Sequence, residues 1–225
     1  KPVMNLNWEW DINDKSSLGT VLYGSFGRGG GTGGIGGGRV RTESGLINFD
    51  ATAADTSATY VRRSSVNNHN WFGLVSKYKR DINDNIKFSV GTDLRRYYGD
   101  HFRQVSHLLG RDSYEQGGST RFPDGVSAQT EYDANPWAAV FDFADRDDRI
   151  AYNNAETIRY AGIFGQVEYS ADAFSAYFQG ALSTQDHVRH ELYYASEEDE
   201  DSDKVVNNGY NTKLGLSYDI NGNSS

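Results

Sequence analysis

The stretch WFGLVSKYKRDINDNIKFSVGTDLRR, from Trp71 to Arg96, gives the strongest indication of the fold. In its second half, apolar and polar side chains alternate, which is the pattern of a β-strand with one apolar and one polar face. The first face carries Ile86, Phe88, Val90, Thr92 and Leu94. The second face carries Lys87, Ser89, Gly91, Asp93 and Arg95. Because the polar turn Asp81-Ile82-Asn83-Asp84 precedes this strand, the stretch predicts a long β-hairpin.

The length of these strands separates two kinds of β protein. A strand in a soluble sandwich usually has about 5–6 residues, whereas a tilted strand that crosses a bilayer needs about 9–11. Long alternating strands joined by short turns at one end are typical of outer-membrane β-barrels. We therefore expect an all-β fold, an antiparallel up-and-down segment of a transmembrane β-barrel.

Period-two alternation recurs outside this hairpin and predicts seven strands in all. They cover residues 3–11, 15–27, 68–80, 84–98, 157–170, 173–190 and 209–219. Short turns are expected near residues 12, 82, 171 and 221. Long insertions alternate with them, at residues 28–66, 99–156 and 197–208. A membrane barrel has this arrangement because its short turns lie at the periplasmic face and its long loops lie outside. Strands joined in this way are expected to be neighbours in sequence order.

We expect the apolar phase of the strands to face lipid and the polar phase to face the lumen. The residues predicted to face the membrane are Phe88, Val90, Leu94, Phe178, Leu182, Leu214 and Leu216. Those predicted to point inward are Lys87, Asp93, Gln179 and Lys213. Aromatic residues beside the short turns form the expected interfacial girdle, namely Trp10, Tyr78, Tyr169, Phe174 and Tyr218.

The number of strands predicts that the barrel is larger than this chain. Single-chain bacterial barrels have an even number of strands, and an open sheet in lipid leaves its edges unsatisfied. In addition, Lys1-Pro2 is not the start expected of a natural chain. We therefore expect residues 1–225 to belong to one barrel domain of a longer protein.

The sequence predicts local structure in two of the insertions. The first begins with a glycine run from Arg28 to Arg39. It lacks the Lys-Ser/Thr pair and the following helix of a phosphate-binding loop, so a surface loop is expected. In the second, the segment 99–109 is predicted to hold a short helix with Asp100 as its N-cap.

The insertion 99–156 is also predicted to carry the ligand contacts. Loops longer than about 12–15 residues are usually functional or disordered, and the aromatic content of this one allows it to fold on itself. Leu108, Leu109 and Phe141 are expected to pack inside the loop. Exposed aromatic residues beside arginines are favoured at binding surfaces. The candidate ligand-binding residues are therefore Tyr97, Tyr98 and Trp137.

Composition and motifs argue against several other functions. Acidic residues outnumber basic ones by 31 to 22, a net charge of −9, which disfavours a nucleic-acid partner. The chain has no cysteine, so it has neither disulfides nor thiol chemistry. Its five histidines are scattered, and neither Gly-x-Ser-x-Gly nor His-Glu-x-x-His occurs. No enzyme activity, catalytic residue or cofactor is therefore expected.

Two acidic runs, 142–149 and 197–203, contain carboxylates of the kind that Ca²⁺ prefers. Charge runs are more often solvated. The first run is also interleaved with arginines and lacks the glycine of a known calcium loop. We therefore predict no metal site in either run, and the binding of divalent ions that bridge lipopolysaccharide stays open for both.

Three segments resemble TonB-dependent outer-membrane receptors of the Bacteroidetes type. They are SFGRGGGTG (25–33), SSVNNHNWFGL (64–74) and GTDLRRYYGDHF (91–102). The resemblance covers the chain as barrel only. It implies a 22-stranded barrel in the cell outer membrane, plugged by an N-terminal domain that this sequence does not contain. The implied partners are outer-membrane lipid and lipopolysaccharide, the rest of the barrel and its plug, an inner-membrane TonB-type energy-coupling complex and a surface lipoprotein.

Two other functions remain open alongside this one. A passive porin or adhesin-type barrel would have no plug, and a soluble carbohydrate-binding β-sandwich would have both sheet faces covered. The ligand also stays open among a siderophore, a vitamin, a glycan and a peptide, because the matching segments are barrel and loop patterns.

Overall fold

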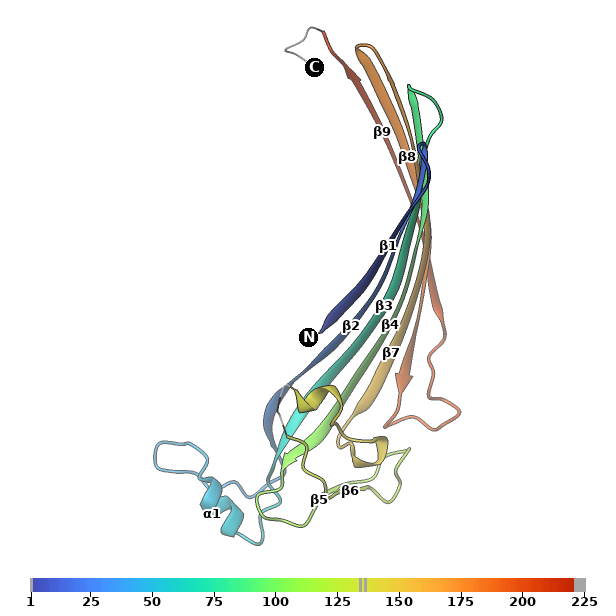
Figure 1. The fold of residues 1–225 in the computed structure, drawn as a ribbon. Coiled ribbons are helices and arrows are strands. Elements are labelled where there is room, and N and C mark those ends of the chain that lie inside the picture. The colour runs from blue at the N-terminus through green and yellow to red at the C-terminus, as the bar shows by residue number, and fades with distance from the viewer. Residues whose placement is uncertain (1, 134, 136, 221–225) are drawn as a thin grey trace.

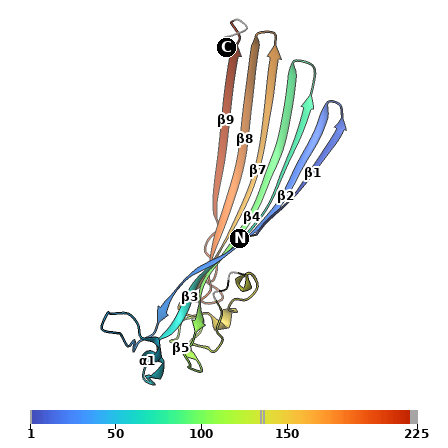
Figure 2. The same ribbon diagram turned by 60° about the vertical axis from the view of Figure 1, so that its left-hand side comes forward.

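Seven long strands form one antiparallel sheet in the computed structural model, which describes residues 2–133, 135 and 137–220 (Figure 1). The strands are β1 (Val3–Asn13), β2 (Ser16–Ile35), β3 (Val61–Asp81), β4 (Ile86–His107), β7 (Asn153–Ala171), β8 (Phe174–Glu191) and β9 (Val205–Tyr218). Each strand pairs with its neighbour in sequence, so the predicted up-and-down order is confirmed. The sheet is curved and open, with β1 and β9 at its edges, and does not close into a barrel (Figure 2).

Short and long connections lie at opposite ends of the sheet (Figure 1). At one end, tight turns join β1 to β2, β3 to β4 and β7 to β8. In the second of these turns, the Asn83 side chain accepts hydrogen bonds from the backbone N–H groups of Asn85 and Ile86, as short polar side chains commonly do in turns. The turn expected near residue 221 lies outside the described residues.

The strands run further toward the loop end than the sequence predicted. The glycine run is not a surface loop, because β2 continues through it to Ile35 and pairs with β3 from Val61 onward. At two of its positions, Gly30 and Gly34, a larger side chain would clash with the neighbouring segment. A Cβ at Gly30 would lie 2.5 Å from the backbone oxygen of Ser65, and one at Gly34 would meet the ring of Tyr60. The first insertion therefore shrinks to residues 36–60, which contain the short helix α1 (Phe49–Ala54) capped by Asn48.

The helix predicted at 99–109 is wrong. β4 continues to His107 and keeps its register with β3 as far as Arg63 and Val105. The segment has a local signal for a helix N-cap, but pairing with the neighbouring strand supplies its backbone hydrogen bonds. Tertiary structure therefore outweighs the local helix propensity. Asp100 caps no helix, and its carboxylate instead binds Arg149.

The connection from β4 to β7, residues 108–152, folds against the end of the sheet. It contains β5 (Tyr114–Gln116), β6 (Val126–Ala128) and the 3-10 turns η1 (Ala138–Val140) and η2 (Arg146–Asp148). Two buried clusters hold it in place. The first is Val61, Val105, Leu108, Tyr114, Val126, Ala128, Ile150 and Tyr193. The second is Val66, Phe102, Tyr132 and Ala144. Leu108 is buried in the loop as expected, whereas Phe141 is exposed.

The two clusters lie on opposite faces of the sheet, because Phe102 and Val105 are an odd number of residues apart on one strand. Both faces of the β3–β4 hairpin are therefore covered at the loop end. Within the described residues, no helix has the length and apolar character needed to cross a membrane.

Candidate functional site

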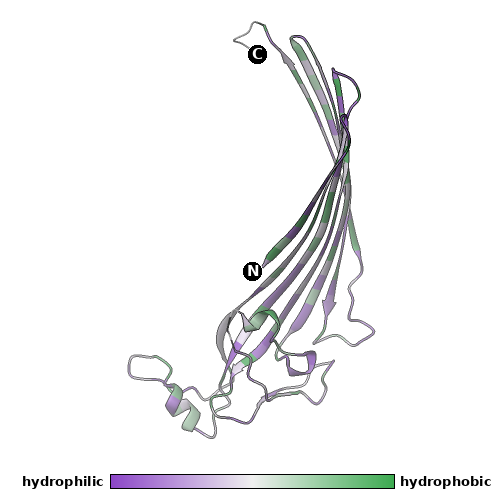
Figure 3. Ribbon diagram, in the orientation of Figure 1, coloured by the Kyte–Doolittle hydropathy of each residue, from purple (hydrophilic) through white to green (hydrophobic). Residues whose placement is uncertain are grey.

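Strand register divides the sheet into two faces of different chemistry. Directly paired residues share a face, so the row Leu6, Leu22, Leu74 and Leu94 marks what we call the apolar face. Asp93 and Arg95 mark the other, the polar face. Figure 3 shows hydrophobic segments distributed along the strands beyond the loop end.

The seven residues predicted to face the membrane all lie on the apolar face. Six of them are exposed: Val90 (42%), Leu94 (45%), Phe178 (53%), Leu182 (60%), Leu214 (67%) and Leu216 (68%). Phe88 is partly buried. The four residues predicted to point inward, Lys87, Asp93, Gln179 and Lys213, all lie on the polar face. The alternation in the sequence thus separates these residues into the same two groups as the strand pairing does.

The polar face packs large rings over glycines of neighbouring strands. The Tyr23 ring lies over Gly73, and the Tyr177 ring lies over Gly215, where an added Cβ would come within 2.2 Å and 2.1 Å of ring atoms. An aromatic ring over a glycine covers backbone that has no side chain of its own, which stiffens the sheet.

A chain of four rings, which we call the aromatic ladder, runs along the polar face toward the loops. Trp71 and Tyr97 are a cross-strand pair with ring centroids 4.6 Å apart. The Tyr97 hydroxyl lies 2.6 Å from Nδ1 of His69, whose ring stands edge-on to His101 at 5.2 Å. Nδ1 of His101 lies 2.6 Å from Oδ1 of Asn67. Each ring is therefore positioned by a neighbour.

Gly99 makes this packing possible. A Cβ at this position would lie 2.3 Å from the Tyr97 hydroxyl oxygen and 3.1 Å from Nε2 of His101. The absence of a side chain thus lets tyrosine and histidine fill the space from either side.

Beside the ladder, the same face carries a guanidinium paired with a carboxylate. Arg95 donates to both carboxylate oxygens of Asp93 and lies over the ring of Tyr160, 5.1 Å from its centroid. Flat rings, imidazole nitrogens and a cation together suit a ligand that offers both a planar surface and hydrogen-bonding groups. Trp71 is 36% exposed and so presents its ring to such a ligand.

The three predicted ligand-binding residues do not come together. Tyr97 is 7% exposed and belongs to the ladder. Tyr98 follows it directly, so it lies on the apolar face, where its ring is 6.4 Å from that of His190. Trp137 stands on the loop and is 85% exposed. No sequence pattern predicts Trp71, His69 and His101 as site residues, because they lie on two different strands and are brought together by the pairing register.

A buried ion pair fixes the loop above the sheet. Arg149 binds both carboxylate oxygens of Asp100 at 2.9 Å and also donates to the Asn153 side chain and the Ala144 backbone oxygen. Its guanidinium lies 3.8 Å from the centroid of Phe102. Because Arg149 is 5% exposed, this contact replaces water almost completely and holds the loop in one position.

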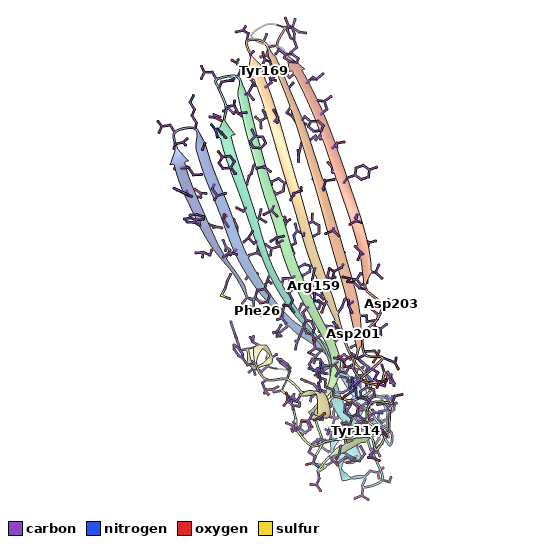
Figure 4. The ribbon with its side chains drawn as sticks, turned by 90° about the vertical axis from the view of Figure 1, so that its right-hand side faces the viewer. Phe26, Tyr114, Arg159, Tyr169, Asp201 and Asp203 are labelled. Atoms are coloured by element: carbon purple, nitrogen blue, oxygen red, sulfur yellow. The ribbon has the colours of Figure 1, made fainter. Side chains whose placement is uncertain are left out.

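The acidic runs are partly paired within the chain. His190, Glu200 and Asp201 bring potential ligand atoms within 4.8 Å of one another. However, Nδ1 of His190 already contacts Asp201 at 2.5 Å, and Arg121 binds Glu197 and Glu200. In the other run, the Tyr132 hydroxyl donates to Asp148 at 2.8 Å. These contacts give the carboxylates a structural role in closing the loops. Figure 4 shows Asp201 and Asp203 at the loop end and Tyr169 at the turn end.

The functional assignment therefore depends on the two faces of the sheet and on the loop above them. Comparison with protein-family models and with curated proteins gives no match for this chain.

Proposed function

We propose that this chain is part of the barrel of a TonB-dependent outer-membrane receptor that binds and imports a scarce nutrient. One observation carries the proposal: large apolar side chains are exposed on one face of every strand, from Leu6 on β1 to Leu216 on β9. An apolar surface of this extent is unfavourable in water. The hydrocarbon of a bilayer would remove that cost.

The height of the apolar face matches a membrane. On β4 it covers about nine residues, from Ile86 to Leu94, which at about 3.3 Å per residue is about 30 Å of strand. A strand tilted by about 40° would then span about 23 Å, close to the apolar band of about 25 Å around outer-membrane barrels. Tyr169, Phe174 and Tyr218 lie beside the turn end, where an aromatic girdle is expected.

The open edges favour a larger barrel. β1 and β9 each have one neighbour in the described sheet, so their outer backbone groups lack strand partners. Unpaired backbone groups in hydrocarbon cost several kcal/mol each, which excludes open sheets from lipid. Further strands on both sides would satisfy these groups, in a barrel of the size that the family resemblance implies.

In this proposal, the ligand surface is formed by the loops and by the aromatic ladder, which lies on the lumen side of the barrel wall near the extracellular end. The ligand binds there and at the apex of the plug, and the inner-membrane coupling complex then drives opening of the plug. Lipid and lipopolysaccharide surround the apolar face, and a surface lipoprotein covers the loops. No covalent bond is made or broken, so the chain is a transporter component and not an enzyme.

Two alternatives differ from this proposal in ways that can be observed. A passive porin or adhesin would lack a plug domain upstream of the barrel. A soluble β-sandwich needs a second sheet over the apolar face. Within the described residues, the second sheet consists only of β5 and β6, of three residues each, which lie at the loop end.

The membrane assignment can be tested with single cysteines, because residues 1–225 contain none. In the full-length protein in outer-membrane vesicles, Leu182→Cys should resist a water-soluble maleimide and react with a lipid-soluble one. The matched variant Ser183→Cys, one residue further on the opposite face, should react with the water-soluble reagent if the lumen is accessible. Equal labelling of both by the water-soluble reagent, or a full-length mass near 25 kDa, would contradict the proposal.

The transport assignment needs a second test. Uptake by cells should stop when the protonmotive force is collapsed with a protonophore, since the coupling complex needs it. Trp71→Ala and His101→Ala should weaken ligand binding, whereas Trp137→Ala tests the loop separately. Uptake that persists without the protonmotive force would favour the porin alternative. Unchanged binding in a Tyr97/Tyr98/Trp137 triple alanine variant would remove these residues from the mechanism.

A further inference from the structure

Two arginines stand side by side at the loop-side border of the apolar face. Arg96 of β4 pairs directly with Arg159 of β7. On this face, it is the next pair toward the loops after Leu94 and Ala161. Both side chains are exposed. Figure 4 shows Arg159 between the turn end of the sheet and the loops. Like charges placed directly opposite on neighbouring strands repel each other, so this arginine pair is unfavourable without a nearby anion.

The described part of the chain supplies no carboxylate within ion-pair distance of either arginine. Across residues 2–133, 135 and 137–220, neither Arg96 nor Arg159 forms an ion pair with a carboxylate. Asp186 is the cross-strand neighbour of Arg159 on its other side, yet the two form no ion pair. The nearby Asp100 is bound by Arg149. The arginine pair is therefore free to bind an external anion.

An open apolar groove of about 720 Å³ adjoins the arginine pair. Its lining includes Leu22, Phe72, Leu74 and Leu94 together with both arginines. The groove thus has an apolar floor and a cationic end, which is the chemistry of a site for an anionic amphiphile. Because the pair lies toward the long loops, the headgroup of such a molecule would lie at the outer surface.

We propose, on the basis of the proposed function, that the arginine pair and this groove bind lipid A, the phosphorylated and multiply acylated glycolipid. A phosphate lies between the two guanidinium groups, each of which can donate two parallel hydrogen bonds to its oxygens. The acyl chains lie along the groove. The row Leu6, Leu22, Leu74 and Leu94 spans four strands, or about 15 Å at about 4.8 Å per spacing. This width suits several acyl chains better than the two of a glycerophospholipid.

The test uses the purified full-length protein in detergent micelles, titrated with lipid A, with bound lipid counted by native mass spectrometry. The double variant Arg96→Gln/Arg159→Gln should bind lipid A about tenfold or more weakly, because each arginine near a lipid phosphate contributes favourably. Arg80→Gln is the matched control, since Arg80 is an exposed arginine on the same face at the turn end. It should change binding by less than about twofold.

Two further ligands make the result decisive. Lipid A without its phosphates should bind the natural protein as weakly as intact lipid A binds the double variant. Phosphatidylglycerol should bind more weakly than lipid A, and equal binding would overturn the choice of ligand. Unchanged lipid A binding in the double variant would overturn the site. If cysteine labelling excludes a membrane, the proposed function fails, whereas loss of this site alone leaves that function intact. An unchanged circular dichroism spectrum of the double variant shows that it has folded.

Discussion

The two ends of β4 have the same alternation of side chains, but the apolar face is exposed at one end and buried at the other. Toward the turns, Val90 and Leu94 on the apolar face are 42% and 45% exposed. Toward the loops, Asp100 and Phe102 continue the same phase and are 9% and 0% exposed. The connection between β4 and β7 covers the second pair, and no other segment that the structure describes covers the first. Among the described residues, the buried hydrophobic clusters therefore lie at the loop end, and the rest of the apolar face depends on its surroundings.

The largest effect is expected at the ion pair that closes the loop end. Arg149→Leu leaves Asp100 buried without a partner, which should destabilise the loop by about 3–5 kcal/mol. Hydrogen exchange across residues 108–152 should become faster while exchange in the turn half of the sheet stays the same. Arg146→Leu, at an exposed arginine three residues earlier, is the control. Uniform acceleration throughout the sheet would show that the two ends are not independent.

The double variant Asp100→Leu/Arg149→Leu sharpens this prediction. Removing both charges avoids an unpaired buried charge, so it should cost less than Arg149→Leu alone. An equal or larger loss would mean that the packing of Arg149 on Phe102, and not the charge, holds the loop.

At the turn end, the next largest effect should depend on which face is changed. Val90→Arg places a charge on the apolar face and should destabilise the barrel by about 2–4 kcal/mol in a bilayer. Ser89→Arg places the same side chain on the polar face and should cost little. The measurement is urea unfolding of the full-length protein in liposomes. Equal costs for the two variants would contradict a lipid-facing apolar surface.

A smaller effect is expected from the ring-over-glycine packing of the polar face. Gly73→Ala brings a Cβ within 2.2 Å of the Tyr23 ring, so the ring must move, at a cost of about 1–3 kcal/mol. Gly19→Ala on the same face meets no atom within 4 Å and serves as the control. Adding Tyr23→Leu to Gly73→Ala should recover part of the loss. No recovery would place the strain in the backbone.

The smallest effect should appear only in alkali. Burial, followed by the hydrogen bond to Asp148, raises the pKa of Tyr132 to about 12. The unfolded pKa of tyrosine is near 10. The stabilisation of the loop by the buried, protonated hydroxyl is therefore complete below pH 10 and is lost as the pH rises toward 12. Tyr132→Phe should remove this pH dependence, with a loss of about 1 kcal/mol at neutral pH. A pH-dependent loop stability that persists in the variant would assign the effect to another group.

Sequence pattern alone predicted the all-β antiparallel class, the strand order and the two phases of each strand. Alternation at every second residue assigned Phe88, Val90 and Leu94 to one face and Lys87 and Asp93 to the other, because a strand offers only two directions to its side chains. Because short turns join consecutive strands, they also predicted that each strand pairs with the next one in the sequence.

Tertiary structure decided where the strands end and which side chains meet. The glycine run and the segment 99–107 carry local signals for a loop and a helix, yet both join the sheet because a neighbouring strand supplies their hydrogen bonds. The same pairing brings Trp71 to Tyr97 and Arg96 to Arg159. It also separates Tyr97 from Tyr98, which are adjacent in sequence but lie on opposite faces. Contacts between strands follow from register, and register is a property of the whole sheet that no single strand encodes.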